Sequence, residues 1–165
     1  ILGSSTDSAQ LAGILGLPYA FASHFAPAQF TAALQLYRKT FRPSESLKKP
    51  YVMACVNVVA ADTDQEANKL ATSLYQMFLG IVSGERKLLQ PPVDNMDEIW
   101  NEYQKEMASQ MLSLSFIGAP DKIKNEMHHF IQQTQIDEIM VISNIYDQQA
   151  KLYSYQLFAE VMKSM

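Results

Sequence analysis

The chain has 165 residues, of which 48% are hydrophobic and 18% charged, and its formal net charge is −4. These values indicate one folded domain with a sizeable core, exclude a disordered chain, and argue against nucleic acid as a partner because there is no basic excess. The single cysteine, Cys55, excludes a disulfide scaffold and favours a cytoplasmic location, and no apolar stretch reaches the roughly 20 residues that a membrane-spanning helix needs.

The first predicted element is a short apolar strand at Ile1 and Leu2, which runs into a turn of glycine and serine residues. A helix over residues 8–15 follows, with Asp7 or Ser8 as its N-cap and Gly16 just beyond its end. Such a turn brings N–H groups, hydroxyls and the positive end of a helix dipole to one point, an arrangement that can bind phosphate. From the residues alone, a plain helix cap is the favoured interpretation. The chain opens inside this element without an initiator methionine, so we expect it to be the C-terminal part of a larger protein.

A short buried strand is predicted at residues 18–23, and a helix begins at Ala26 and Pro27, with proline in its first turn. Apolar residues then recur at helical spacing through residue 41. After a loop at 43–50, residues 51–60 form the clearest strand, β-branched and almost entirely apolar, which is typical of a parallel strand covered on both faces.

The second half of the chain continues the alternation of predicted strands and helices. Thr63 and Glu66 form a capping box at which a helix begins, and an irregular segment rich in glycine and proline follows at 83–95. Helices are expected around residues 96–107 and from 118 onward, then a strand at 139–142 and a closing helix at 147–162. The order is four βα units with an extra helix or two before the last strand, which fits either an open α/β sheet or half of an eight-stranded barrel.

Several short runs decide between these two folds. The runs are LGSS at 2–5, GLPYAFASHF at 16–25, FRPS at 41–44, AADT at 60–63, PPV at 91–93 and DEIMV at 137–141. In this order they resemble the bacterial luciferase-like, flavin-dependent monooxygenases, and the similarity covers essentially all 165 residues. The resemblance implies an α/β fold, the C-terminal half of a (β/α)8 TIM barrel, as a single half-barrel domain over residues 1–165 with the N-terminal half missing.

The resemblance also assigns a cofactor site. In the family, the turn after the fifth strand contacts the phosphate of FMN, which corresponds here to Gly3, Ser4, Ser5 and Ser8. Their chemistry agrees, because glycine permits close backbone approach and serine hydroxyls donate to phosphate oxygens. Ser23 and His24 end the next strand, on the rim where barrel active sites lie, and are expected near the flavin. A catalytic role for His24 competes with a purely structural, hydrogen-bonded one.

Other residues that could carry chemistry receive structural interpretations. Cys55 is expected to be an inert core thiol, and the role of Asn57, which could point into the barrel, is left open. Asp137 and Glu138 precede the last strand, at the stability face of such barrels. The adjacent histidines at 128 and 129 are expected on a solvent-exposed helix face, with no metal site. Residues 83–93 correspond to a flexible lid in relatives, and a plain surface loop is the alternative.

For the intact protein the resemblance implies an enzyme in which reduced FMN, supplied by a separate reductase, and O₂ oxidise a small organic substrate. The alternative is a non-catalytic flavin-binding or structural half-barrel. In either case half a barrel exposes two sheet edges and an apolar inner face. We therefore expect it to pair with its missing N-terminal half or with a second copy, as a homo-oligomer.

Overall fold

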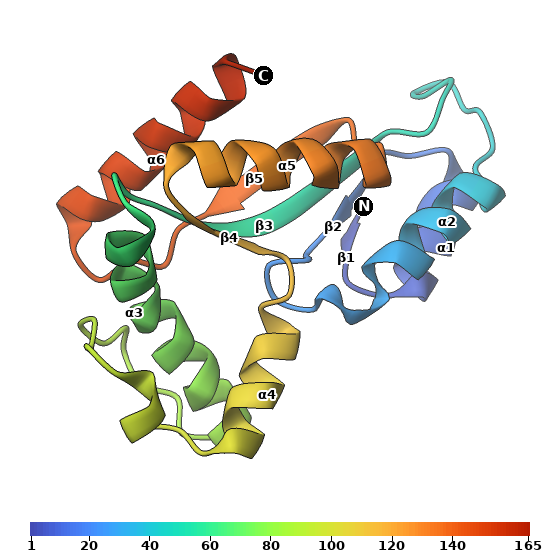
Figure 1. The fold of residues 1–165 in the computed structure, drawn as a ribbon. Coiled ribbons are helices and arrows are strands. Elements are labelled where there is room, and N and C mark those ends of the chain that lie inside the picture. The colour runs from blue at the N-terminus through green and yellow to red at the C-terminus, as the bar shows by residue number, and fades with distance from the viewer.

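The computed structural model describes residues 1–165 and is built on a parallel five-stranded sheet with helices packed around it (Figure 1). The strands are β1 (Leu2–Gly3), β2 (Tyr19–Phe21), β3 (Val52–Ala60), β4 (Ser115–Gly118) and β5 (Glu138–Ile142). The helices are α1 (Thr6–Leu15), α2 (Phe30–Thr40), α3 (Asp64–Ser83), α4 (Glu102–Met111), α5 (Pro120–Thr134) and α6 (Gln148–Lys163), with short 3₁₀ turns at Pro27–Gln29 and Met96–Glu98. None of the helices combines the length and apolar character needed to cross a membrane.

The long strand β3 organises the sheet. β2 pairs with its residues 52–54 and β4 with its residues 57–60, so these two strands follow one another along the same edge of β3. β5 pairs with residues 53–57 on the opposite edge, and β1 extends the sheet beyond β2. Because every pairing is parallel, the carboxyl ends of β1, β2 and β3 point the same way, and the loops that follow them share one edge of the sheet.

The main core lies on one face of the sheet, which we call the outer face. Alternate residues of β3, from Val52 to Val58, point toward it and are almost completely buried. Side chains of α1 and α2 cover this face beside β1 and β2, and those of α5 and α6 cover it beside β3 and β5. A chain of edge-to-face, tilted and stacked aromatic rings connects α2 and α5 with β2 and β4; its members are Tyr19, Phe21, Phe30, Tyr37, Phe116 and Phe130.

The opposite, inner face is covered only near the carboxyl end of β3. There α3 and α4 pack against Val59 in a smaller core with Leu74 and Phe78, and Figure 1 shows these two helices on the far side of the sheet from α5 and α6. Elsewhere this face is open: Leu2 is 73% exposed and Met140 52% exposed. The molecule therefore carries one complete face and one incomplete face.

The predicted order of elements is confirmed, with three corrections. The helix expected around residues 96–107 is divided into the 3₁₀ turn at Met96–Glu98 and α4. Helix α1 begins earlier than expected, because Ser5 and not Asp7 or Ser8 is its N-cap: the Ser5 hydroxyl accepts the Ser8 N–H at 3.4 Å. The expected C-cap is confirmed, since Gly16 adopts the left-handed conformation with φ of 63°. Strand β4 is absent from the sequence prediction. Its four residues are too few to show a period, and they form a strand because they extend the ladder of β3.

Polar contacts tie the amino ends of the strands together. The Val52 N–H donates to the Asp137 carboxylate at 2.7 Å, and the Tyr51 hydroxyl donates to Glu138 at 2.8 Å. The structural role predicted for these two carboxylates is thereby confirmed. Nearby, the Arg38 guanidinium donates to the carbonyl oxygens of Thr134 and Gln135 at 2.7 and 2.6 Å, so a side chain of α2 caps the carboxyl end of α5.

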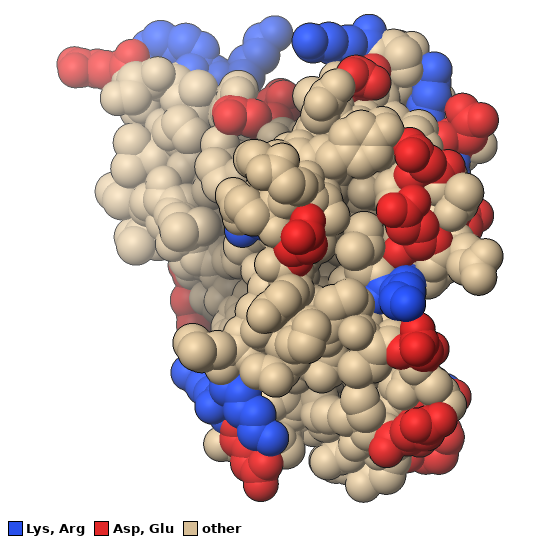
Figure 2. Space-filling model, turned by 90° about the vertical axis from the view of Figure 1, so that its left-hand side faces the viewer, with Lys and Arg blue, Asp and Glu red and all other residues tan.

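Charged residues of both signs are spread over the side of the molecule that Figure 2 shows, with acidic side chains gathered along one edge. This distribution agrees with the modest net charge of −4.

Candidate functional site

Two loops of sequence-predicted site residues lie side by side at the carboxyl edge of the sheet. The first is the turn at residues 3–8 between β1 and α1, and the second is the segment 23–24 after β2. They are adjacent because Gly3 pairs with Phe21 and the Ala22 N–H donates to the Gly3 carbonyl at 2.9 Å. The geometry thus brings all six predicted residues to neighbouring loops.

The Ser8 hydroxyl is used inside the fold. It donates to the Ser5 carbonyl at 2.8 Å and lies 3.0 Å from the hydroxyl of Tyr19, which donates to the same carbonyl at 3.0 Å. Burial raises the pKa of the Tyr19 phenol, and its hydrogen bond with Ser8 lowers it by a smaller amount. Tyr19 therefore stays a neutral donor that fixes the first turn of α1 to the sheet.

Close packing explains the glycine of this turn, because a Cβ on Gly3 would overlap the Ser8 side chain. Ser4 is exposed, and no hydrogen bond within the chain engages its hydroxyl, whereas Ser5 is half-buried as the N-cap. The Thr6 N–H donates to the Gln29 side chain at 3.1 Å. Ser4 is consequently the member of the predicted set whose hydroxyl is free to meet a ligand.

The second loop is held by the backbone of β3. The Ser23 hydroxyl and the His24 N–H both donate to the Cys55 carbonyl at 2.6 Å, and Ser23 is completely buried. The Asn57 amide donates to the His24 carbonyl at 2.7 Å and to the Ser115 hydroxyl at 3.3 Å. Ser23 thus shapes the rim from within, and its donor proton is already committed.

The His24 imidazole is half-buried, and its side chain makes no hydrogen bond within the chain. Burial lowers the pKa of His24, and the nearby Cys55 backbone carbonyl offsets part of that effect. Its Nδ1 atom and the Oδ1 atom of Asn57 are buried without any hydrogen-bond partner. A neutral imidazole at this position offers one donor and one acceptor. Burial also raises the pKa of Cys55, which agrees with its expected inert character.

The adjacent histidines lie on the exposed face of α5, as predicted. The Nε2 atoms of His128 and His129 hydrogen-bond with Gln132 and Gln133, one turn further along the helix, at 2.8 and 2.7 Å. No group of three or more His, Cys, Asp or Glu side chains is placed to hold a metal ion.

The predicted lid segment is irregular between α3 and the turn at Met96–Glu98. Its far end is tied to α3, since Gln76 donates to the Pro91 carbonyl at 2.9 Å and the Val93 N–H donates to Thr72 at 2.8 Å. Residues 84–88 are exposed. A cavity of about 300 Å³ separates this segment from the β2 rim; its lining residues are Phe25, Met77, Ile81, Arg86 and Lys87.

Sequence reasoning misses two sets of hydrogen bonds that hold the loops at this edge of the sheet. The sequence places Tyr19 only in a buried strand, although a buried phenol needs a hydrogen-bond partner and so signals one. Asn57 is recognisable as a buried amide, but its partners His24 and Ser115 lie 33 and 58 residues away in sequence, and no local pattern reveals such pairs.

Comparison with known proteins decides the family. The sequence model of the luciferase-like monooxygenases matches residues 1–138. The chain belongs to this family. It is 47% identical over 164 residues to the uncharacterized protein YvbT of Bacillus subtilis (strain 168), covering 99% of this chain and 49% of that protein. It is 45% identical to a luciferase-like monooxygenase of Escherichia coli (strain K12), over 100% and 49% of the two chains.

Solved structures of other proteins share the fold. Apo-MsnO8 superposes with a TM-score of 0.79 at 29% identity, over 98% of this chain and 49% of that one. The FMN complex of the oxygenating constituent of 3,6-diketocamphane monooxygenase from Pseudomonas putida gives a TM-score of 0.59 at 18% identity, over 96% and 46% of the two chains, a likeness of fold alone. The chain spans about half the length of the relatives it matches, and the predicted half-barrel fold is confirmed.

Proposed function

We propose that the intact protein is a monooxygenase that uses reduced FMN and O₂ to oxidise a small organic substrate, and that the turn at residues 3–8 holds the FMN phosphate. One observation carries the proposal: in a chain of this family, a glycine–serine turn at a helix N-terminus lies beside His24 at the carboxyl edge of the sheet. The FMN complex of a structural neighbour supports the choice of cofactor.

The residues present fit a phosphate group. The Ser4 hydroxyl faces solvent without a partner, and it directly precedes Ser5, the N-cap of α1, where the positive end of the helix dipole lies. Ser5 and Ser8 contribute by fixing the backbone, since their hydroxyls are engaged with each other and with Tyr19. Asp7 is exposed in the first turn and has to lie away from a bound dianion.

The flavin supplies the redox chemistry when bound, and the chain supplies position and shielding. His24 is a neutral imidazole that can donate or accept a hydrogen bond at the rim, and Asn57 fixes its backbone through the carbonyl oxygen. Segment 83–93 faces this rim across the cavity lined by Phe25, and we propose that it excludes water as a lid.

The phosphate assignment is tested by titrating FMN and riboflavin and following flavin fluorescence. We expect Ser4→Ala to weaken FMN binding about tenfold, the equivalent of one charge-assisted hydrogen bond, and to leave riboflavin unchanged. Ser46→Ala, in the exposed loop at 43–50, is the matched control and should change neither affinity. Equal losses for FMN and riboflavin would refute the assigned role of Ser4.

A turnover assay distinguishes a monooxygenase from a non-catalytic half-barrel. Consumption of O₂ and of an organic substrate with reduced FMN from a separate reductase supports a monooxygenase. Flavin binding without turnover supports a non-catalytic flavin-binding half-barrel, and the absence of flavin binding supports a structural one. One observation favours the purely structural half-barrel: the hydrogen bonds among Ser5, Ser8 and Tyr19 are those of an ordinary helix cap.

We further propose that the open inner face of the sheet is covered by the other half of the barrel in the intact protein and, in the isolated chain, by a second copy. Leu2 and Met140 are large apolar side chains exposed on this face, with Met53 and Cys55 half-buried between them. Such a surface on a monomer favours association. The missing half of the barrel and a second copy of the chain would each bury these same side chains.

A further inference from the structure

A second cavity lies outside the proposed FMN site, between α3, α4, β4 and the beginning of α5. Its volume is about 440 Å³, within the range of small-molecule sites. It shares no residue with the turn at 3–8 or with the segment 23–24. Its lining residues are Asn68, Tyr75, Trp100, Lys105, Ser109, Leu112, Ser115, Ile117, Lys122 and Glu126.

Two aromatic rings form the floor of this cavity. The Tyr75 and Trp100 rings lie with their centroids 5.8 Å apart and their planes tilted by 33°. Burial raises the pKa of Tyr75, so its hydroxyl is neutral. Flat π-systems stack favourably on such surfaces, and apolar area buried against them adds to the affinity of a planar ligand.

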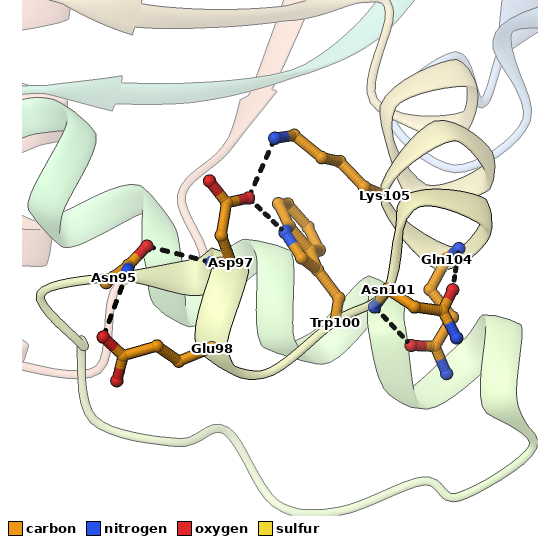
Figure 3. A network of polar contacts seen from close by, with 7 residues as sticks. All are labelled: Asn95, Asp97, Glu98, Trp100, Asn101, Gln104 and Lys105. Atoms are coloured by element: carbon orange, nitrogen blue, oxygen red, sulfur yellow. Dashed lines mark hydrogen bonds and ion pairs between the residues drawn. The ribbon is translucent and has the colours of Figure 1, made fainter.

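The orientation of the indole is fixed before any ligand arrives. The Trp100 indole N–H donates to Asp97 at 3.1 Å, and the Lys105 ammonium contacts the same carboxylate oxygen at 2.8 Å. The Asp97 N–H is in turn held by the Asn95 side chain at 3.0 Å, as Figure 3 shows. The bonds from Lys105 and Trp100 lower the pKa of Asp97, which keeps this anchor ionised. A preorganised floor loses little freedom on binding.

Two lysine side chains lie at the mouth of the cavity, and each has a carboxylate beside it, Asp97 for Lys105 and Glu126 for Lys122. The two lysine side chains are 41% and 42% exposed. Lys105 uses one of its three N–H donors on Asp97. Lys122 donates to the Ile117 carbonyl at 2.9 Å and lies 4.0 Å from Glu126. Both ammonium groups therefore retain donors for an anionic group.

We propose that this cavity binds a small planar organic anion of the aromatic carboxylate class, with its ring on Tyr75 and Trp100 and its carboxylate between Lys105 and Lys122. The hydroxyls of Ser109 and Ser115 provide further polar contacts. Ser115 also accepts a hydrogen bond from Asn57, which donates to the His24 carbonyl, so a ligand here touches a residue that is two hydrogen bonds away from His24.

The experiment uses Trp100 as its own reporter, because it is the sole tryptophan of the chain. Benzoate is titrated into the ¹⁵N-labelled chain at constant ionic strength, and the single indole N–H resonance is followed by NMR. We expect a saturable shift with benzoate. Benzyl alcohol, which keeps the ring without the charge, and cyclohexanecarboxylate, which keeps the charge without the flat ring, should each bind at least fivefold more weakly.

Variants locate the contact. Lys122→Met should weaken benzoate roughly fivefold, as expected for one partly exposed ion pair. Lys124→Met, on the same helix but outside the cavity lining, should have no effect. Tyr75→Leu removes half of the floor while keeping the reporter, and should also weaken binding. Circular dichroism melts of each variant establish that the chain is folded before its affinity is interpreted.

Three outcomes would overturn the proposal. The first is an indole resonance that does not saturate with benzoate, and the second is equal affinities for benzoate, benzyl alcohol and cyclohexanecarboxylate. The third is tested by adding FMN to the benzoate complex. If FMN displaces benzoate competitively, the cavity belongs to the flavin site and the proposal of a separate site fails. Because the readout needs neither flavin nor turnover, its result is independent of the proposed monooxygenase function.

Discussion

The two faces of β3 differ in completeness although the strand is apolar along almost its whole length. On the outer face Ala54, Val56 and Val58 are sealed by helices of the same chain. On the inner face Met53 and Cys55 are half-buried, and the cover that α3 and α4 provide is centred on Val59. An apolar strand such as β3 requires cover on both of its faces. The helices present in this chain are enough to cover the outer face, and the inner face needs further elements from outside the chain.

The largest effect is expected from a charge on the complete face. Val56→Asp places an unpaired carboxylate among fully buried side chains, which costs several kcal/mol by the order of magnitude of buried ions, and should abolish cooperative unfolding. Cys55→Asp, one residue earlier on the incomplete face, should retain a cooperative urea transition, because water reaches that side chain. Equal damage from both substitutions would mean that the two faces are equally sealed.

An intermediate effect is expected on association. Met140→Glu introduces charge on the open face and should convert the isolated chain to a monomer of 18.6 kDa in size-exclusion chromatography with light scattering. Leu152→Glu is the matched control, because both side chains are 52% exposed and Leu152 lies on α6. A wild-type chain that is already a well-behaved monomer would remove the basis for the proposed pairing.

The smallest effect concerns pH at His24, in the loop after β2 at the carboxyl edge of the sheet. Burial lowers the pKa of His24 in the folded state below its value of about 6.5 in the unfolded chain, so the unfolded state binds the proton more tightly. The contribution of the neutral imidazole to stability is therefore present above about pH 6.5 and declines as the pH falls below it.

The pH effect is measured by comparing urea midpoints at two pH values, one about a unit above and one about a unit below the pKa of a free histidine. The wild-type chain should lose more stability on acidification than His24→Gln, and the assigned imidazole signal should titrate below the value of a free histidine peptide. An imidazole that titrates at or above that value would show that the incomplete face leaves His24 open to water.

The sequence predicts the features that depend on local patterns. The apolar run of β3, the capping residue Thr63 and the glycine cap of α1 are each legible from a few consecutive residues, and the structure has them. The family resemblance adds the half-barrel, which periodicity alone leaves open. It also names the site residues, and the structure brings these together in neighbouring loops at the carboxyl edge of the sheet.

The features that could not be predicted depend on distant partners. Strand β4 exists because β3 has a free edge beyond the end of β2, which no pattern within Ser115–Gly118 reveals. At the Ser5 N-cap, the hydroxyl of Tyr19, in the next strand, donates to the Ser5 carbonyl, a contact that no pattern near Ser5 reveals. The Trp100 floor likewise requires α3 and the segment before α4 to meet, and neither signals the other in sequence.

The contact between Arg38 and the end of α5 spans 96 residues of sequence, and the exposed loop at 43–50 lies between its two sides. A protease that nicked this loop would produce two peptides that remain joined, through this guanidinium and through the pairing of β2 with β3. The contacts between the first two βα units and the remainder of the chain therefore do not depend on chain continuity. When the two peptides are separated and mixed again, they should reassemble into the native fold.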